Sequence, residues 1–134
     1  MKTKTEVLPA GNYYVGDLMY AANESLEWLS DALWTADRGT PHYFTSPDGK
    51  YQGCAMRTAL GDGVYEDQDE DTYCVDSGSL GAIPVDAVDP EDHEYLKGLG
   101  FFIQFDEPFT CHYSDEYGIC SFGDINIMTN PENY

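Results

Sequence analysis

The run "LGFFIQFDEPFTCHYSDEYGICSFGDINIMT", residues 99–129, decides the fold. Its apolar and aromatic residues gather in four short stretches, "LGFFIQF", "FTCHYSD", "GICSF" and "DINIMT". Turn-forming residues at 106–108, 115–118 and 123–124 separate these stretches. Short strands that follow one another at such close spacing are typical of an antiparallel meander.

Similar patterns continue upstream of this run. The stretches "HYFTS" and "KYQGCAMRTAL" flank Pro47-Asp48-Gly49, a turn in which proline presets φ and glycine accepts a positive φ. "GVY" and "TYCVDSG" flank the acidic run "EDQDED", residues 66–71, in the same manner, and "LGAIPV" is a further apolar stretch. The sequence therefore predicts about eight short strands.

Two helices are expected among these strands. Asn23 is a suitable N-cap for a helix of about three turns over residues 23–35, in which Leu26, Leu29 and Leu33 recur at helical spacing. A shorter helix of about two turns follows Asp89 as N-cap and ends near Gly98. We predict an α+β fold that is rich in antiparallel sheet, with one three-turn helix and one short helix, in a single compact domain over residues 1–134.

The charge of the chain is strongly negative. There are 25 aspartates and glutamates against 6 lysines and arginines, a formal net charge of -19. This charge disfavours nucleic acid and anionic membranes as partners and favours a cationic protein surface. The chain has no long apolar run and no apolar stretch near its start, so a cytoplasmic location is expected.

Three groups of carboxylates form the predicted partner-binding surface. The first is the run "EDQDED", which offers nothing apolar to bury and is therefore expected to project as the tip of a hairpin. Residues on the same face of a strand lie about 6.6 Å apart, which places charges on the scale of a nucleic-acid backbone. The groups are Glu66, Asp67, Asp69, Glu70 and Asp71; Asp86, Asp89, Glu91, Asp92 and Glu94; and Glu24, Glu27 and Asp31.

No cofactor and no tight metal site are predicted, and only a weak, nonspecific divalent-ion site at the acidic turn stays open. Asp67, Asp69 and Asp71 match the first ligand positions of an EF-hand loop, but Thr72 stands where glycine is needed and Gly78 where glutamate is needed. The cysteines and histidines lack the spacing of a zinc site.

Catalysis is not predicted either. Asp17, Asp62 and Asp76 each adjoin a glycine, and whether they form a site or only turns stays open. Ser77 follows Asp76 directly, and adjacent strand residues point to opposite faces, which argues against a nucleophile–base pair there.

The four cysteines are widely separated in the sequence. Cys54, Cys74, Cys111 and Cys120 form no C-x-x-C pair and are expected to be reduced thiols in or beside the core. A bridge between Cys111 and Cys120 across a hairpin stays open.

Several phrases of the sequence resemble those of a protein family. The segments "LPAGNYYVGDLMY", "GDGVY" and "TYCVDSGSLGAIPV", together with "SFGDINI" after "FDEPF", resemble small proteins of unassigned activity that phages and prophages encode. The resemblance covers most of the chain and implies a shared fold, a viral or mobile-element origin and an anti-defence role. It carries over no catalytic residue. Where the family pattern has an Asp-Gly turn at the hairpin tip, this chain has Asp69-Glu70-Asp71.

Two functions from different classes follow. The first is nucleic-acid mimicry, in which the carboxylates occupy the cationic nucleic-acid-binding surface of a host defence protein of the restriction or CRISPR type. The alternative is a phage accessory or structural module that binds protein through its tyrosines without mimicry. The tyrosines that would line that surface are equally suited to the core of the strands; they are Tyr13, Tyr14, Tyr20, Tyr43, Tyr51, Tyr65 and Tyr73. A small hydrolase-like enzyme is the third and least favoured hypothesis.

Overall fold

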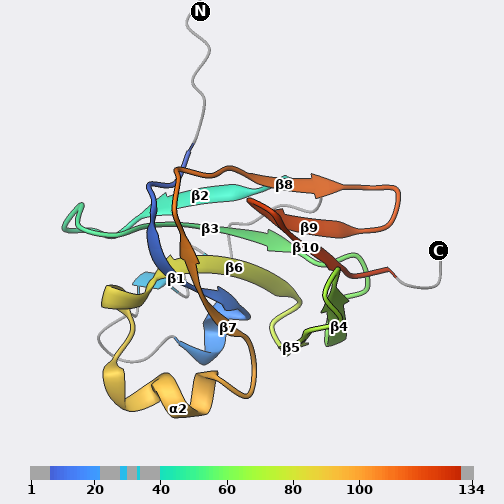
Figure 1. Cartoon of the computed structure of the whole chain (residues 1–134), viewed down its shortest axis with the longest axis horizontal. Helices are drawn as coiled ribbons and strands as arrows, with labels where there is room; N and C mark the ends of the chain where they lie inside the picture. Colours follow the sequence, from blue (N-terminus) through green and yellow to red (C-terminus); the bar gives the residue numbers. More distant parts are fainter. Residues whose placement is uncertain (1–6, 22–27, 30–32, 34–39, 131–134) are drawn as a thin grey trace, which may run out of the picture.

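The computed structural model of the protein describes residues 7–21, 28, 29, 33 and 40–130. These residues form two five-stranded antiparallel sheets (Figure 1). The first sheet has the order β2-β3-β6-β1-β7, and the second has the order β5-β4-β10-β9-β8. The strands are β1 (Gly11–Gly16), β2 (His42–Thr45), β3 (Gln52–Arg57), β4 (Gly63–Asp67), β5 (Thr72–Val75), β6 (Ser79–Pro84), β7 (Phe101–Phe105), β8 (Cys111–Ser114), β9 (Ile119–Phe122) and β10 (Ile125–Met128).

The β-rich prediction is confirmed, whereas the predicted strand count and the predicted meander need correction. The described residues form ten strands, whereas about eight were expected. Strands β8, β9 and β10 are neighbours in one sheet, as a meander requires, but β7 pairs with β1 in the other sheet. The chain changes sheets within residues 106–110, where Pro108 interrupts the strand and Phe109 pairs with Leu8 in an isolated bridge.

The first sheet is covered on both faces. Its central strands β1, β3 and β6 are each buried over at least four consecutive residues, a pattern typical of a strand between two apolar layers. One face packs against the second sheet around residues such as Tyr13, Met56 and Phe122. The opposite face packs against short helical elements around Tyr14, Leu18 and the other members of a separate apolar cluster. The second sheet alternates buried and exposed residues along β4 and β5, so its outer face is open to solvent.

The helical elements lie against the first sheet. Asp89 is the N-cap that the sequence predicts, and its side chain accepts a hydrogen bond from the Glu91 N–H at 3.0 Å. The 3-10 turn η4 (Pro90–Asp92) leads into α2 (His93–Leu96), whose C-cap is Lys97 rather than the expected Gly98.

The predicted helix over residues 23–35 falls mostly outside the described residues, so its length and its Asn23 cap stay predictions. Within it, Trp28, Leu29 and Leu33 have helical backbone, and both leucines are buried in the cluster beneath the first sheet. Among the described residues, no helix has the length and apolar character needed to cross a membrane.

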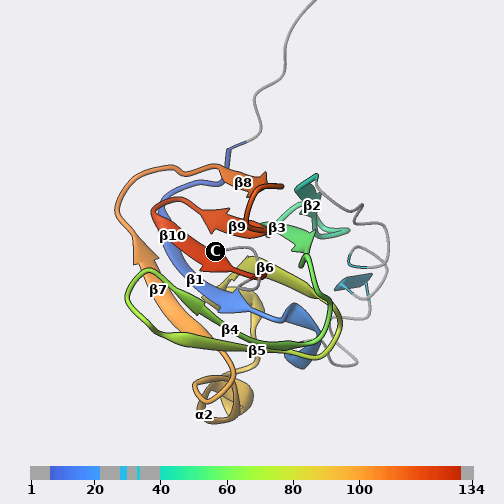
Figure 2. The same cartoon turned by 90° about the vertical axis from the view of Figure 1, so that its right-hand side faces the viewer.

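Hydrogen bonds join the two sheets at both of their edges. The Tyr43 hydroxyl on β2 accepts from the Cys111 N–H on β8 at 2.7 Å and donates to the Cys111 carbonyl at 3.4 Å. At the other side, the Cys74 N–H on β5 donates to the Leu99 carbonyl, just before β7, at 3.0 Å. Figure 2 shows the two sheets curving toward each other. These contacts occupy backbone groups that an open sheet edge would leave unpaired.

All four cysteines are free thiols. Cys54, Cys111 and Cys120 are buried and Cys74 is half-buried. Burial raises the pKa of the Cys120 thiol to about 12. Cys111 lies opposite Phe122 and Cys120 lies opposite Tyr113, so the two cysteines are offset along the β8–β9 ladder and no bridge joins them.

The edge contact of Tyr43 gives a first testable prediction. Tyr43→Phe should lower the free energy of unfolding by about 1–3 kcal/mol, because the Cys111 N–H loses its partner in a partly buried position. Urea unfolding followed by circular dichroism would measure this change. Tyr51→Phe is the matched control, since it removes an exposed hydroxyl that donates to the Asp86 carbonyl, and it should cost less than about 0.5 kcal/mol. Equal effects of the two substitutions would contradict the role given to Tyr43.

Candidate acidic binding surface

The acidic run forms the tip of the β4–β5 hairpin. The Asp67 N–H donates to the Asp71 carbonyl and the Glu70 N–H donates to the Asp67 carbonyl, each at 3.0 Å, which closes a loop of three residues, 68–70. Glu70 has φ of 65°, in the left-handed region where such hairpin loops favour glycine. The predicted hairpin is therefore confirmed, and the tip has a defined conformation.

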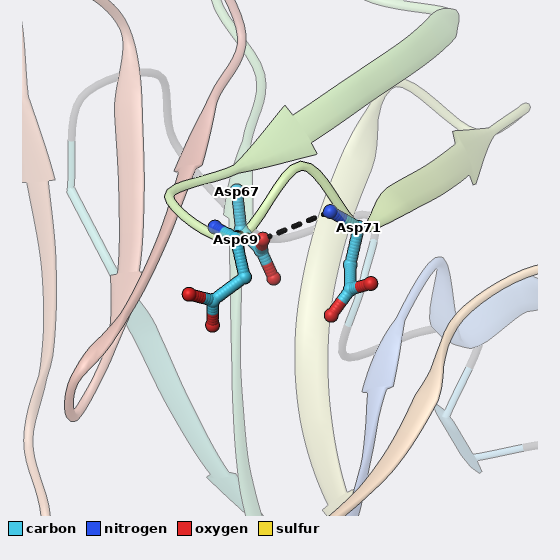
Figure 3. Close-up of side chains that lie close together, drawn as sticks. All are labelled: Asp67, Asp69 and Asp71. Atoms are coloured by element: carbon cyan, nitrogen blue, oxygen red, sulfur yellow. Dashed lines mark hydrogen bonds between the residues drawn. The ribbon is translucent and has the colours of Figure 1, made fainter.

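Asp67 corrects the expectation that the whole acidic run is exposed. Its side chain is only 2% exposed and points inward. One carboxylate oxygen, Oδ1, accepts from the Asp69 N–H at 2.8 Å and from the Asp71 N–H at 3.1 Å, as drawn for Asp71 in Figure 3. The other, Oδ2, accepts from the Tyr73 hydroxyl at 2.8 Å. Asp67 is thus part of the fold, whereas Glu66, Asp69, Glu70 and Asp71 are exposed.

The alternation of buried and exposed residues along β4 is a sequence signal that Asp67 is buried. Tyr65 and Asp67 are two residues apart on β4 and so share a face, and Tyr65 is buried. Tyr73 faces Tyr65 across the hairpin. Burial, followed by the hydrogen bond to Asp67, raises the pKa of the Tyr73 hydroxyl well above its usual value, so this hydroxyl keeps its proton and donates.

The tip carboxylates are bunched rather than spaced along a strand. One oxygen from each of Asp67, Asp69 and Asp71 lies within 4.8 Å of the others, close enough to hold a metal ion in principle (Figure 3). Asp67, however, already accepts three hydrogen bonds. A metal would therefore compete with the bonds that shape the turn, and the absence of a tight metal site stays a prediction.

The tip is tied to the neighbouring β9–β10 turn. The Gln68 side chain donates to the Asp124 carbonyl at 2.7 Å and accepts from the Asn126 N–H at 2.9 Å. These bonds place the exposed Asp124 beside the hairpin tip. The sequence predicts only that Asp124, like Asp106 and Glu107, is a turn residue. Nothing local in the sequence marks Asp124 as part of this surface.

The other predicted groups lie elsewhere. Asp86, Asp89, Glu91 and Glu94 are exposed and Asp92 is half-buried, on the elements from η3 (Val85–Ala87) to α2. These elements cover the face of the first sheet opposite the second sheet, so this group is in a different layer from the tip. Glu94 also pairs with Lys97 at 3.1 Å. Glu24, Glu27 and Asp31 fall outside the described residues.

Asp17, Asp62 and Asp76 lie in or beside a pocket. Asp62, Asp76, Ser77 and Tyr20 are among the residues that line a pocket of about 590 Å³. Asp17 is fully buried behind it. Burial, followed by the nearby Asp76 and Asp17 carboxylates, raises the pKa of the Tyr20 hydroxyl to about 12.

Asp17 acts as a clamp between distant segments. Its carboxylate accepts from the Asp76 and Ser77 N–H groups and from the Ser77 hydroxyl, each at 2.7 Å, and from the Met19 N–H at 3.0 Å. Ser77 therefore contacts Asp17, 60 residues away in the chain, and nothing local in the sequence indicates this pairing. These four hydrogen bonds occupy the Asp17 carboxylate and tie the end of β1 to residues 76 and 77, as a structural clamp requires.

Comparison of the chain with protein-family models, with curated proteins and with solved structures found no match.

The burial of Asp67 gives a second prediction. Asp67→Ala should lower the free energy of unfolding by about 2–3 kcal/mol, because the Tyr73 hydroxyl and two turn N–H groups lose their acceptor. The control, Asp69→Asn with Asp71→Asn, should leave it unchanged within about 0.5 kcal/mol or raise it slightly through relieved repulsion. Thermal and urea unfolding distinguish the two variants, and a double variant as unstable as Asp67→Ala would show that the exposed carboxylates are structural.

The left-handed backbone at Glu70 gives a third prediction. Glu70→Gly should raise the free energy of unfolding by about 0.5–1 kcal/mol, since the conformation costs a non-glycine residue about 1–2 kcal/mol and glycine loses about 0.5–1 kcal/mol more backbone entropy than other residues on folding. Glu70→Gln removes the same charge without changing the backbone preference. If the glycine and glutamine variants unfold at the same urea concentration, the gain comes from charge alone.

Proposed function

We propose that this protein is an acidic nucleic-acid mimic that occupies the cationic nucleic-acid-binding surface of a host defence protein. The supporting observation is the distribution of carboxylates. Apart from the buried Asp17 and Asp67 and the half-buried Asp92, every aspartate and glutamate of the described residues is exposed. The same part of the chain contains only three lysines and arginines, namely Lys50, Arg57 and Lys97. Its surface is therefore of nearly one sign, which attracts and steers a cationic partner.

The hairpin tip is the strongest part of this surface. Asp67 fixes the turn from inside, and Gln68 fixes it from the side against the β9–β10 turn. Rigid carboxylates lose little conformational freedom on binding, so more of their attraction appears as affinity. The groups expected to bind are Glu66, Asp69, Glu70, Asp71 and Asp124, together with the separate group on η3, η4 and α2.

The sequence, rather than the structure, indicates the kind of partner. The resemblance to phage-encoded proteins makes a restriction or CRISPR-type protein in the host cytoplasm the proposed target. Occupying its nucleic-acid groove needs no cofactor and no catalysis, which agrees with the engaged Asp17 carboxylate.

A protein-binding module without mimicry is the second candidate. Exposed apolar side chains favour it, because Val64 is 63% exposed on the outer face of the second sheet and Leu60 is 50% exposed. Of the tyrosines named for such a surface, Tyr13, Tyr14, Tyr65 and Tyr73 belong instead to the core, which is the other alternative that the sequence left open. An apolar interface would persist at high salt, whereas a charged one would weaken.

Competition with DNA tests the mimicry. The immobilised protein should capture a nucleic-acid-binding protein from a bacterial lysate at low salt, and mass spectrometry would identify it. Duplex DNA should then displace the purified partner from the immobilised protein, at DNA concentrations near the dissociation constant of the partner–DNA complex. Asp69→Asn with Asp71→Asn should slow association about tenfold and reduce its dependence on salt, as surface plasmon resonance would measure.

Polyglutamate is the control for nonspecific attraction. It carries negative charge without a folded display, so it should displace the partner only at much higher concentration. A partner that binds protein and DNA simultaneously, or that binds independently of salt, would contradict mimicry and favour the module.

A further inference from the structure

We propose that the groove between the end of β7 and the β9–β10 turn is a docking site for an arginine- or lysine-bearing segment of the partner protein. The groove has a volume of about 770 Å³ and runs beside residues 103–110 and 123–125. The inference rests on the proposed function and deepens it, because it adds an anchoring site with an apolar floor to a surface otherwise described by charge alone.

The floor of the groove includes two aromatic residues, Phe105 and Phe109. Phe105 and Phe109 stack with ring centroids 3.8 Å apart, and Tyr13 packs edge-on against both rings. Val7 adds an apolar side chain that is 41% exposed, and Ile125 also lines the groove. Such a floor can cover the aliphatic stem of a long basic side chain.

The rim of the groove is acidic. Asp106, Glu107 and Asp124 are all exposed. No lysine, arginine or histidine is among the described residues that line the groove. Carboxylates around an apolar floor match a segment that carries both cationic and apolar groups, and they exclude nucleic acid. A second copy of the chain is disfavoured because each copy carries a net charge of -19.

The β9–β10 turn packs closely against the two phenylalanines of the groove. Gly123 has φ of 59°, and its N–H donates to the Thr110 carbonyl at 3.0 Å. A side chain at this position would begin 3.1 Å from a ring carbon of Phe105 and 3.3 Å from Cβ of Phe109, so glycine lets the turn lie directly on the floor. The binding shape therefore exists before the partner arrives, which reduces the cost of binding.

Asp124 makes the groove continuous with the hairpin tip. Its carbonyl accepts from Gln68 of the tip, while its side chain belongs to the rim. A partner segment seated in the groove therefore brings its neighbouring cationic groups to Asp69 and Asp71. The groove supplies apolar contact at a fixed place, and the tip supplies charge beside it.

A labelled peptide tests the groove directly. The probe is a fluorescein-labelled peptide of alternating arginine and leucine, measured by fluorescence anisotropy, and its partner probe has citrulline in place of each arginine. Glu107→Gln with Asp124→Asn should weaken binding of the arginine peptide about five- to tenfold. Asp115→Asn with Glu116→Gln removes one aspartate and one glutamate from the exposed β8–β9 turn and should change binding less than about twofold.

Each outcome decides the inference. Equal losses in the rim variant and the turn variant would mean that the peptide senses only net charge, and equal binding of the citrulline peptide would mean that the groove does not select a cation; either result overturns the proposal. Chemical-shift changes at Phe105 and Phe109 with the arginine peptide, lost in the rim variant, would support it. Circular dichroism and melting of every variant verify folding.

The DNA-competition experiment separates this inference from the proposed function. If DNA displaces the captured partner, and binding of the partner depends on Asp69 and Asp71 but not on the rim, mimicry stands and the groove inference fails. If the arginine peptide binds the groove while DNA leaves the captured partner in place, the groove inference stands and mimicry fails.

Discussion

The need to keep negative charge out of an apolar interior governs this structure. A chain with 25 acidic and 6 basic residues has too few cations to neutralise its carboxylates in pairs. Each of the two buried carboxylates in the described residues is instead surrounded by donors, with four hydrogen bonds to Asp17 and three to Asp67. A buried charge without such donors would cost several kcal/mol. All but one of the other carboxylates in the described residues are exposed, so the same constraint that shapes the interior also creates the acidic surface.

The two buried carboxylates have different structural tasks. Asp17 joins the end of β1 to the loop between β5 and β6, segments some 60 residues apart, and thereby fixes the first sheet relative to the second. Asp67 acts locally and gives the hairpin tip one conformation. Tyr43 likewise links β2 to β8. In each of these contacts the acceptor of the backbone N–H is a side-chain oxygen rather than the carbonyl of a neighbouring strand. The exposed carboxylates are thus displayed on a scaffold in which turns and edges are both fixed.

The sequence was a good guide to local structure and a poor one to the assembly of the surface. Turn residues and apolar spacing predicted the hairpins, and Asp89 predicted the start of the short helix, because both depend on neighbours within a few residues. The pairing of β7 with β1 could not be predicted, since the apolar pattern of residues 101–105 suits either sheet. Asp124 and Asp106 looked like ordinary turn residues, and only long-range packing brings them to one groove. Asp67 had a usable signal in its spacing from Tyr65, but its charge suggested exposure.

The pairing of β1 also determines when the protein can fold during translation. Strand β1 lies between β6 and β7, so its neighbours are residues 79–84 and 101–105. The ribosome must therefore synthesise most of the chain before the first sheet is complete. Until then Tyr13, Tyr14 and Val15 lack one or both of the strands that pair with them. Such long-range pairing is slow and leaves apolar strands open to aggregation. Mutual repulsion between nascent chains of strongly negative charge opposes that aggregation, so the acidic composition protects the polypeptide before it has a surface to present.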